Sequence, residues 1–544
     1  MRQPTQARLS APARWSARAT RSAPAAALTA TTSEAHALIR RTNTNRRERA
    51  ATKPGRADPG ENWYRWRTRV QAGPSDDAAA RRRRVRLVAS SRRSSSFRAA
   101  ARRRSPAPSA ARCLRSAGRC RSPPARLSAG EQGHAPSFFS GADVVSVDYS
   151  PARRLADPPA AIVPFQPSYE DRPGAPDRVF AAVDDEAYER LVAAWSEALA
   201  RAGAASADIL HLHHLTPANE AALRAFPAVP VVGQLHGTEL ALLRAIEAGV
   251  PAGWRFAGRW AARQRRWAQA CERLIVPPGA AEEVARLLGV PFERVQALPS
   301  GVELELFERR ALGPKERLLH WRRWLVEEPL GWDESGTPGT VAYREADLWP
   351  FREAEAILLY VGRYTAVKRL PLLLRAHARA LERLGKPLPL ILVGGHPGEW
   401  EGQHPLATAR ALGNDQVFLA GWRPHELLPQ ALNAADLLVL PSVAEAFGLV
   451  LVEAMSCGLP VIAAEAPGPV EIVAAGTGWL VPADDEDALA DALVTAASDA
   501  EERRRRGARA YRHSHTHYGW PLIAARIGAL YAELLAASPR AARA

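Results

Sequence analysis

Two glutamates stand eight residues apart around the expected start of a helix, Glu445 before it and Glu453 inside it. Eight residues exceed two helical turns, so the two carboxylates are expected on different faces and at different depths. The backbone N–H groups of Phe447, Gly448 and Leu449 are free at such a helix start and suit a phosphate. Carboxylates repel a phosphate, so we expect them to accept hydrogen bonds from sugar hydroxyls beside it. A capped, packed helix is the competing interpretation.

Two cations and a histidine follow other apolar runs. Arg363 and Lys368 come directly after the run 356–362. The planar fork of an arginine and the point charge of a lysine can converge on one diphosphate, although a solvated basic turn explains the same pair. His236 ends the run 229–235 and precedes a glycine. That position would let it meet a ligand, but a lone histidine is more often structural.

Ligand sets with the spacing of metal sites are missing from the sequence. The four cysteines form neither a disulfide framework nor a paired zinc motif. The histidines at 211, 213 and 214 are not accompanied by a carboxylate or a cysteine at the spacing of a metal site. The acidic triplet 485–487 stands at an expected helix start, where it complements the helix dipole. We therefore expect no metal ion, and the cysteines fit a reducing cytoplasm.

The candidate residues fall at the ends of strands that alternate with helices. The expected strands are nearly continuous in apolar residues, which is typical of a parallel sheet covered on both faces. Two successive units of this kind predict an α/β protein of two Rossmann-like domains, with a ligand crevice between them at the carboxyl ends of the strands. The expected strands are 142–149, 207–215, 229–237, 273–279 and 295–303, then 356–364, 388–395, 417–422, 436–442, 460–464 and 478–482.

Five segments follow from this pattern. Residues 1–135 form a leader rich in Arg, Ala, Ser and Pro, which we expect to be disordered because it cannot bury enough apolar surface. Residues 136–307 form an N-terminal Rossmann-like domain, and 308–350 an interdomain connection with an insertion. Residues 351–510 form a C-terminal Rossmann-like domain, followed by a terminal helix within 511–544.

The net positive charge of the chain comes from the leader alone. The whole chain has a net charge of +16, but the leader alone has 31 Lys and Arg against 7 Asp and Glu, and the remainder has 42 against 50. We therefore expect no specific nucleic-acid partner for the folded part. The leader has three competing interpretations: an arm that binds polyanions, a transit-type peptide, or a stretch translated out of frame. We favour the last.

The motifs in combination resemble the retaining glycosyltransferases of family 4, which have the two-domain GT-B architecture. The resemblance extends from about residue 140 to the C-terminus. The matching stretches are HGTEL (236–240), LPSGVELELF (298–307), YVGRYTAVKRL (360–370), LVGG (392–395), the run from Ala420 to Ala463 that includes EAFGLVLVE, and GTGWLVPADDEDALADAL (476–493).

This resemblance implies a metal-independent hexosyltransferase that uses a nucleotide-diphospho-sugar as donor and needs no other cofactor. Arg363 and Lys368 would hold the diphosphate, Glu445 the sugar hydroxyls, Glu453 the ribose, and His236 the sugar from the N-terminal domain. The base would lie near residues 421–427. The residues assigned to catalysis are His236, Arg363, Lys368 and Glu445, and those assigned to donor binding are Gly362, Gly421, Phe447, Gly448, Leu449 and Glu453.

The sequence departs from the family at its beginning, where a first strand and a Gly-rich loop are expected and residues 1–135 show neither. Hence we hypothesise a mistranslated leader and an N-terminal domain that lacks its first βα unit. Two alternatives to a transferase stay open: a nucleotide-sugar 2-epimerase of similar architecture, and a catalytically impaired nucleotide-sugar-binding protein. Since no apolar run reaches the ~20 residues that span a bilayer, we expect a cytoplasmic protein, with peripheral membrane contact left open. The acceptor hydroxyl is not identified by the sequence.

Overall fold

In a computed structural model of the chain, the structure describes residues 86–87, 145, 147–149, 151–152, 163–165, 167–170 and 178–537. The disorder predicted for residues 1–135 thus lies outside the described residues, except at β1 (Arg86–Leu87). The strand predicted at 142–149 is wrong where the structure describes it, because Val145 and residues 147–149 belong to no strand. The Ala152 N–H instead donates to the Tyr149 carbonyl in a turn (3.2 Å). Alternating apolar residues alone do not make a strand without a neighbour to pair with.

The described part of the first sheet contains five parallel strands in chain order, β1-β2-β3-β4-β5. β2 is buried at every residue and β4 at all but its first, which fits a sheet covered on both faces. After β1, the strands are β2 (Leu210–His213), β3 (Val231–Gln234), β4 (Arg273–Val276) and β5 (Val295–Ala297). The helices of this half are α2 (Asp185–Arg201), α3 (Pro217–Ala225), α4 (Thr238–Ala248), α5 (Ala257–Ala270) and α6 (Ala281–Leu288).

The second sheet has the order β11-β10-β9-β6-β7-β8, and every described pairing in it is parallel. The strands are β6 (Leu358–Gly362), β7 (Leu390–Gly394), β8 (Val417–Gly421), β9 (Leu437–Leu440), β10 (Val461–Ala464) and β11 (Gly478–Val481). The helices are α9 (Leu370–Leu384), α10 (Pro405–Ala411), α11 (Leu428–Ala434), α12 (Leu449–Ser456), α13 (Pro469–Ile472) and α14 (Glu486–Ser498). The predicted fold class of two parallel α/β domains is therefore confirmed.

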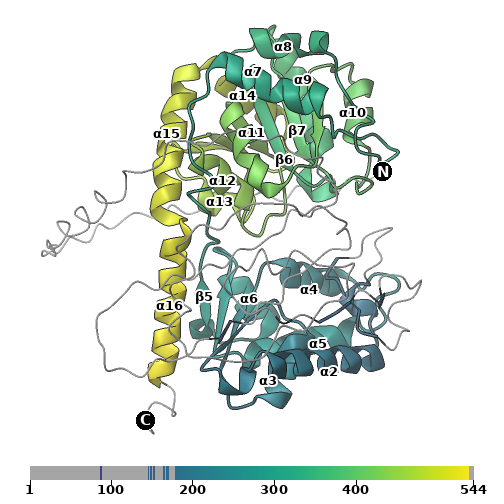
Figure 1. Cartoon of the computed structure of the whole chain (residues 1–544), viewed down its shortest axis with the longest axis vertical. Helices are drawn as coiled ribbons and strands as arrows, with labels where there is room; N and C mark the ends of the chain where they lie inside the picture. The colour runs from purple at the N-terminus through teal and green to yellow at the C-terminus, as the bar shows by residue number, and fades with distance from the viewer. Residues whose placement is uncertain are drawn as a thin grey trace, which may run out of the picture. The chain divides into compact units, whose positions relative to one another are not determined.

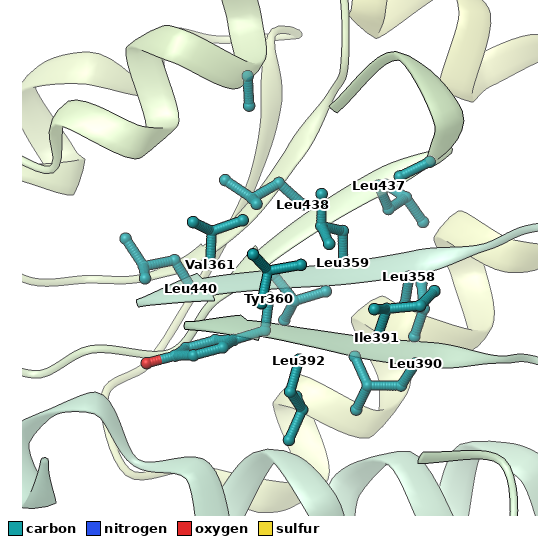
Figure 2. Close-up of a cluster of buried hydrophobic side chains, with 14 of the residues drawn as sticks. Leu358, Leu359, Tyr360, Val361, Leu390, Ile391, Leu392, Leu437, Leu438 and Leu440 are labelled. Carbon is teal, nitrogen blue, oxygen red and sulfur yellow. The ribbon is translucent and has the colours of Figure 1, made fainter. Parts of the chain in front are cut away.

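The strand order reverses between β6 and β9. The chain runs outward from β6 through β7 to β8, then returns to place β9 on the other side of β6, with Leu358 beside Leu437. Such a reversal opens a crevice at the carboxyl ends of the two strands, which is where ligands bind in doubly wound sheets. Leucine, isoleucine and valine side chains of β6, β7 and β9 fill the space around these strands (Figure 2). Packing of this kind fixes the strand ends that carry the candidate site.

The connection at 308–350 packs into this second core. It contains α7 (Pro314–Arg322), a π-helical turn (Arg323–Glu327), and later α8 (Trp349–Glu353). Trp321, Trp324 and Trp332 are buried in the same cluster as the strands of the second sheet. Three buried indole rings contribute a large apolar area, so this segment stabilises the C-terminal half.

Two long helices end the described chain. α15 (Ala500–His517) lies along the C-terminal half, and α16 (Trp520–Ala537) packs on the first sheet (Figure 1). Ile523 and Ile527 of α16 are buried against Val232 of β3 and Ile275 of β4. α16 corrects one expectation, because its 18 residues have a mean hydropathy of 1.3 and are long and apolar enough to cross a membrane. One such helix is weak support for a membrane span, since core helices share its length and composition.

Candidate active site

Lys368 and Glu445 come together where the sheet reverses. Lys368 follows β6 and Glu445 follows β9, and the two side chains form an ion pair. Both are largely buried, with 11% and 14% of the side chain exposed. The loops that carry them are also joined by the backbone, where the Val443 N–H donates to the Val367 carbonyl (3.0 Å). A cation and a carboxylate are therefore fixed next to each other at the expected ligand position.

Arg363 occupies the turn directly after β6, and Tyr360 holds this turn in place. The Tyr360 hydroxyl donates to the Arg363 carbonyl (2.7 Å). Gly362 makes room for that contact, because a Cβ there would lie 2.6 Å from the tyrosine oxygen. The Arg363 guanidinium is 3.2 Å from Glu170. Arg363 and Lys368 thus pair with separate carboxylates in this structure.

The stretch after Glu445 turns into α12 as expected, with the helix beginning at Leu449. Gly448 precedes it with φ +92°, a left-handed conformation that glycine adopts without strain. Phe447 is buried, and its ring packs edge-on against Tyr518, with centroids 5.8 Å apart. Its side chain therefore belongs to the core, which leaves its backbone as the part that can contact a ligand.

Glu453 lies in the second turn of α12 and is more deeply buried than Glu445. Only 5% of its side chain is exposed, and one carboxylate oxygen is 2.7 Å from Nε2 of His425. Glu445 and Glu453 thus have different partners and different depths, as the sequence predicted. His425 was missed, because a histidine in an irregular stretch carries no periodic signal. Its position just after Gly421, in the loop assigned to the base, was the available clue.

Gly421 ends β8 in a left-handed conformation with φ +69°. A Cβ at this position would lie 1.9 Å from the Leu330 carbonyl oxygen. Only glycine permits so close an approach of two backbones. The loop assigned to the base is therefore in direct contact with the connection at 308–350.

His236 follows β3 and is held by a second histidine. Nδ1 of His213 and Nε2 of His236 are 2.9 Å apart, and the two rings stack at 11°. Burial lowers the pKa of His213 well below its ordinary value, so this ring is neutral near pH 7. A Cβ on Gly237 would lie 2.4 Å from Cβ of Ala446. The turn that carries His236 therefore contacts the residue after Glu445.

Glu239 anchors the same turn from the first turn of α4. This carboxylate is fully buried and accepts hydrogen bonds from Nδ1 of His214 (2.5 Å) and from the backbone N–H of His236 (3.3 Å). His214 takes a left-handed conformation, with φ +65°, which is unusual for a residue other than glycine. The structure thus adds three groups, His213, His214 and Glu239, to the predicted His236.

No group of three or more His, Cys, Asp or Glu side chains in the described part of the chain is arranged to hold a metal ion. The positive charge at the switch point instead comes from Arg363, Lys368 and the start of α12. This arrangement can bind an anion beside hydroxyl-accepting carboxylates.

Two family profiles match the chain, one on each half. The profile described as "Glycosyltransferase Family 4" covers residues 130–306, and the one described as "Glycosyl transferases group 1" covers residues 345–513. Together they span every candidate site residue and all strands of the two sheets except β1.

Curated relatives and a solved structure agree with these matches. The D-inositol 3-phosphate glycosyltransferase 1 of Catenulispora acidiphila is 30% identical over 66% of this chain and 79% of its own length. The D-inositol 3-phosphate glycosyltransferase of Kribbella flavida is 34% identical over 48% of this chain, which spans 57% of that relative. The sucrose-phosphate synthase structure from Thermosynechococcus elongatus has a TM-score of 0.51 at 23% identity, covering 68% of this chain and 83% of its own, and supports the fold.

Proposed function

Because the chain belongs to glycosyltransferase family 4, we propose that it transfers a sugar from a nucleotide-diphospho-sugar to an acceptor hydroxyl with retention of anomeric configuration. The observation that carries this proposal is the Lys368–Glu445 pair at the reversal between β6 and β9. It supplies one group for a phosphate and one for sugar hydroxyls at the point where a doubly wound sheet binds ligands.

The chemistry follows from charge and position. Arg363 and Lys368 hold the diphosphate and stabilise the negative charge that develops as the bond between sugar C1 and the phosphate oxygen breaks. The acceptor oxygen forms the new bond to C1 from the same face, and its proton passes to the departing phosphate oxygen. Glu445 accepts hydrogen bonds from the sugar and so orients C1, and His236 contacts the sugar from the N-terminal half.

Donor binding requires the present ion pairs to open. Lys368 is paired with Glu445, and Arg363 with Glu170. A diphosphate provides a stronger partner for both cations than either single carboxylate, since it carries more charge and more acceptor oxygens. The carboxylate of Glu445 is released at the same time, and the sugar hydroxyls replace the lysine as its partner. The pair therefore keeps both groups satisfied until the donor arrives.

We also propose that the reaction needs no metal ion or other cofactor, because two cations and the N-terminus of α12 already surround the expected diphosphate. Transfer rates in excess EDTA and in added Mg²⁺ test this. Equal rates support it, and loss of transfer in EDTA that Mg²⁺ restores contradicts it. We propose a cytoplasmic location, where nucleotide-sugars and reduced cysteines such as Cys271 and Cys457 are expected.

The acceptor is proposed from the two curated relatives, which are named for D-inositol 3-phosphate. This compound is the first acceptor to test, with unphosphorylated inositol as its control. A phosphate requirement would show as transfer to the first compound and little or none to the second.

The decisive experiment is a thermal-shift series with UDP-, GDP- and ADP-sugars, followed by product analysis with the donor that binds. A ligand at 100 times its Kd adds about 2.7 kcal/mol to the free energy of unfolding, which is readily measured. A shift with one donor and a glycosylated product with retained configuration support the proposal. A shift without product indicates the impaired binding protein, and an epimerised nucleotide-sugar formed without acceptor indicates the 2-epimerase. No shift with any donor contradicts the donor site.

A further inference from the structure

His425 and Glu453 form a buried pair in the loop region assigned to the nucleoside. Nε2 of His425 lies 2.7 Å from Oε1 of Glu453, with 21% and 5% of the two side chains exposed. An ionised carboxylate only accepts hydrogen bonds, so the proton between them belongs to Nε2. The histidine is therefore the donor, and the pairing fixes which of its nitrogens carries hydrogen.

The backbone that carries His425 is held on both sides. Gly421 contacts the Leu330 carbonyl, and the buried guanidinium of Arg423 donates to the carbonyls of Trp324 (2.9 Å) and Glu328 (2.7 Å). Burial lowers the pKa of Arg423 to about 10, which still leaves it charged near neutral pH. The His425 position is thus set by a rigid loop.

The imidazole ring of His425 is fixed as well. It packs edge-on against the buried Phe307, with ring centroids 5.1 Å apart. A ring held by an aromatic contact on its face or edge and by a hydrogen bond at one nitrogen has little rotational freedom. The carboxylate that it binds is therefore held in one orientation too.

Within the described residues, the His425 bond is the only hydrogen bond that Glu453 receives on its carboxylate. Its second oxygen, Oε2, keeps its acceptor capacity. In the proposed function, Glu453 meets the ribose of the donor. The histidine donates to Oε1, so Oε2 is the oxygen that keeps both of its acceptor positions for the sugar.

We propose that His425 is a positioning residue for Glu453: it holds Oε1 so that Oε2 accepts a hydrogen bond from one ribose hydroxyl, and the pair thereby selects ribonucleotides over their deoxy analogues. This inference rests on the proposed nucleotide-sugar site. A site built to bind a hydroxyl discriminates strongly against the analogue that lacks it, because the buried acceptor is then left unpaired.

The test measures the affinity of the full chain for nucleoside diphosphates by titration calorimetry. UDP, GDP and ADP identify the nucleotide that binds, and its 2′-deoxy and 3′-deoxy forms then measure the preference for each hydroxyl. We expect one deoxy form to bind at least about 10-fold more weakly than the ribonucleotide. In His425→Leu this preference should fall to within about 2-fold, whereas His425→Gln, whose amide N–H can still donate to Glu453, should keep most of it.

Controls separate positioning from structural damage. Glu453→Ala should lose the preference, and adding His425→Leu to it should change nothing further, since the carboxylate is already gone. His517→Leu, an exposed position on α15, should behave like the wild type. Thermal melting of each variant shows whether it is folded. If His425→Leu alone is unstable, His425→Gln and the double variant at positions 425 and 453 still test the proposal.

The outcomes distinguish a failure of the donor site from a failure of the inference about His425. If no nucleotide binds the wild type, the proposed donor site fails and this inference fails with it. If the wild type binds but does not distinguish the deoxy forms, or if a folded His425→Leu distinguishes them as well as the wild type does, the inference about His425 is overturned while the proposed function stands.

Discussion

Nζ of Lys368 and a carboxylate oxygen of Glu445 form an ion pair between two loops that are 77 residues apart in the chain. Their strands, β6 and β9, are neighbours only because the sheet reverses its order between them. The pair therefore depends on the long-range topology of the sheet rather than on any local structure.

Glu445→Ala should abolish transfer and leave the fold intact. The side chain lies on a loop at the ligand position, and loss of one group that orients and stabilises the transition state typically costs 10²–10³-fold in rate. The measurement is the rate of product formation together with the melting temperature. A variant that melts like the wild type and transfers at a similar rate would remove Glu445 from the mechanism.

Lys368→Ala should weaken nucleotide diphosphate binding more than it lowers stability. The lysine is paired with Glu445, and its loss removes a positive charge from the proposed phosphate position. Lys386→Ala is the matched control, because that lysine forms an exposed ion pair with Glu355 instead of pairing with a residue of the candidate site. Calorimetric titration should show a loss of about 10-fold or more for Lys368→Ala and no loss for the control. Equal affinity in both variants would contradict the phosphate role.

A buried histidine in the C-terminal core should make stability depend on pH. His377 donates from Nε2 to the Leu388 carbonyl (2.6 Å), and its Nδ1 accepts from the Asn414 amide (2.9 Å). This pattern requires the neutral ring, and burial lowers the pKa of His377 from 6.5 to about 4. The unfolded chain then binds a proton at a higher pH than the folded chain. Stability is complete above about pH 6.5 and is lost as the pH falls toward 4, by about 3 kcal/mol.

The variant His377→Gln isolates this contribution. A glutamine can donate to Leu388 and accept from Asn414 without titrating, so its unfolding free energy should vary less between pH 7 and pH 4 than that of the wild type. His517→Gln, on the exposed surface of α15, should follow the wild-type curve. The unfolding free energies are measured by urea titration at each pH. If they change equally with pH in the wild type and in His377→Gln, His377 does not contribute to the pH dependence of stability.

Much of the fold followed from sequence because its strands are continuous in apolar residues. β7 and β9 are buried at every residue and β6 at all but its last, and each appears in the sequence as an apolar run bounded by glycine or polar residues. α15 shows where this reasoning stops. Its buried positions, Arg503, Gly507, Ala510 and Ser514, recur at helical spacing, but only Ala510 among them is a core hydrophobic residue. Gly507 instead permits close backbone contact with Gly458, a feature that hydrophobic periodicity does not reveal.

The candidate site was predictable where a charged residue follows an apolar strand, as at Arg363, Lys368 and Glu445. It was not predictable where a residue acts through another. His425 and Glu239 are positioned by loops and helices whose mutual placement is set by tertiary packing. The sequence places both near site residues along the chain, but nothing local shows that their side chains meet them.

Gly421→Ala should destabilise the C-terminal half more than the same change at another left-handed glycine. A Cβ at Gly421 would lie 1.9 Å from the Leu330 carbonyl, whereas Gly413 has a similar φ of +62° and nothing within 4 Å. Gly413→Ala isolates the conformational cost, about 1–2 kcal/mol. Gly421→Ala must also displace Leu330, and it should lower the free energy of unfolding by about 1–3 kcal/mol more than Gly413→Ala does. Urea unfolding of both variants measures the difference, and equal losses would mean that the loop relaxes freely.

His213→Phe should slow transfer without weakening nucleotide diphosphate binding. The neutral imidazole of His213 contacts His236 at 2.9 Å, and phenylalanine keeps the stacked ring but removes that hydrogen bond. His236 is proposed to meet the sugar, whereas the phosphates are held by Arg363 and Lys368 in the other half. The expected result is a fall in kcat of about 10-fold, the same Kd for the free nucleotide, and partial rescue in His213→Asn, whose amide can replace the lost bond. A fall in nucleotide affinity equal to the fall in kcat would instead indicate general damage to the site, and an unchanged kcat would mean that His236 does not need this support.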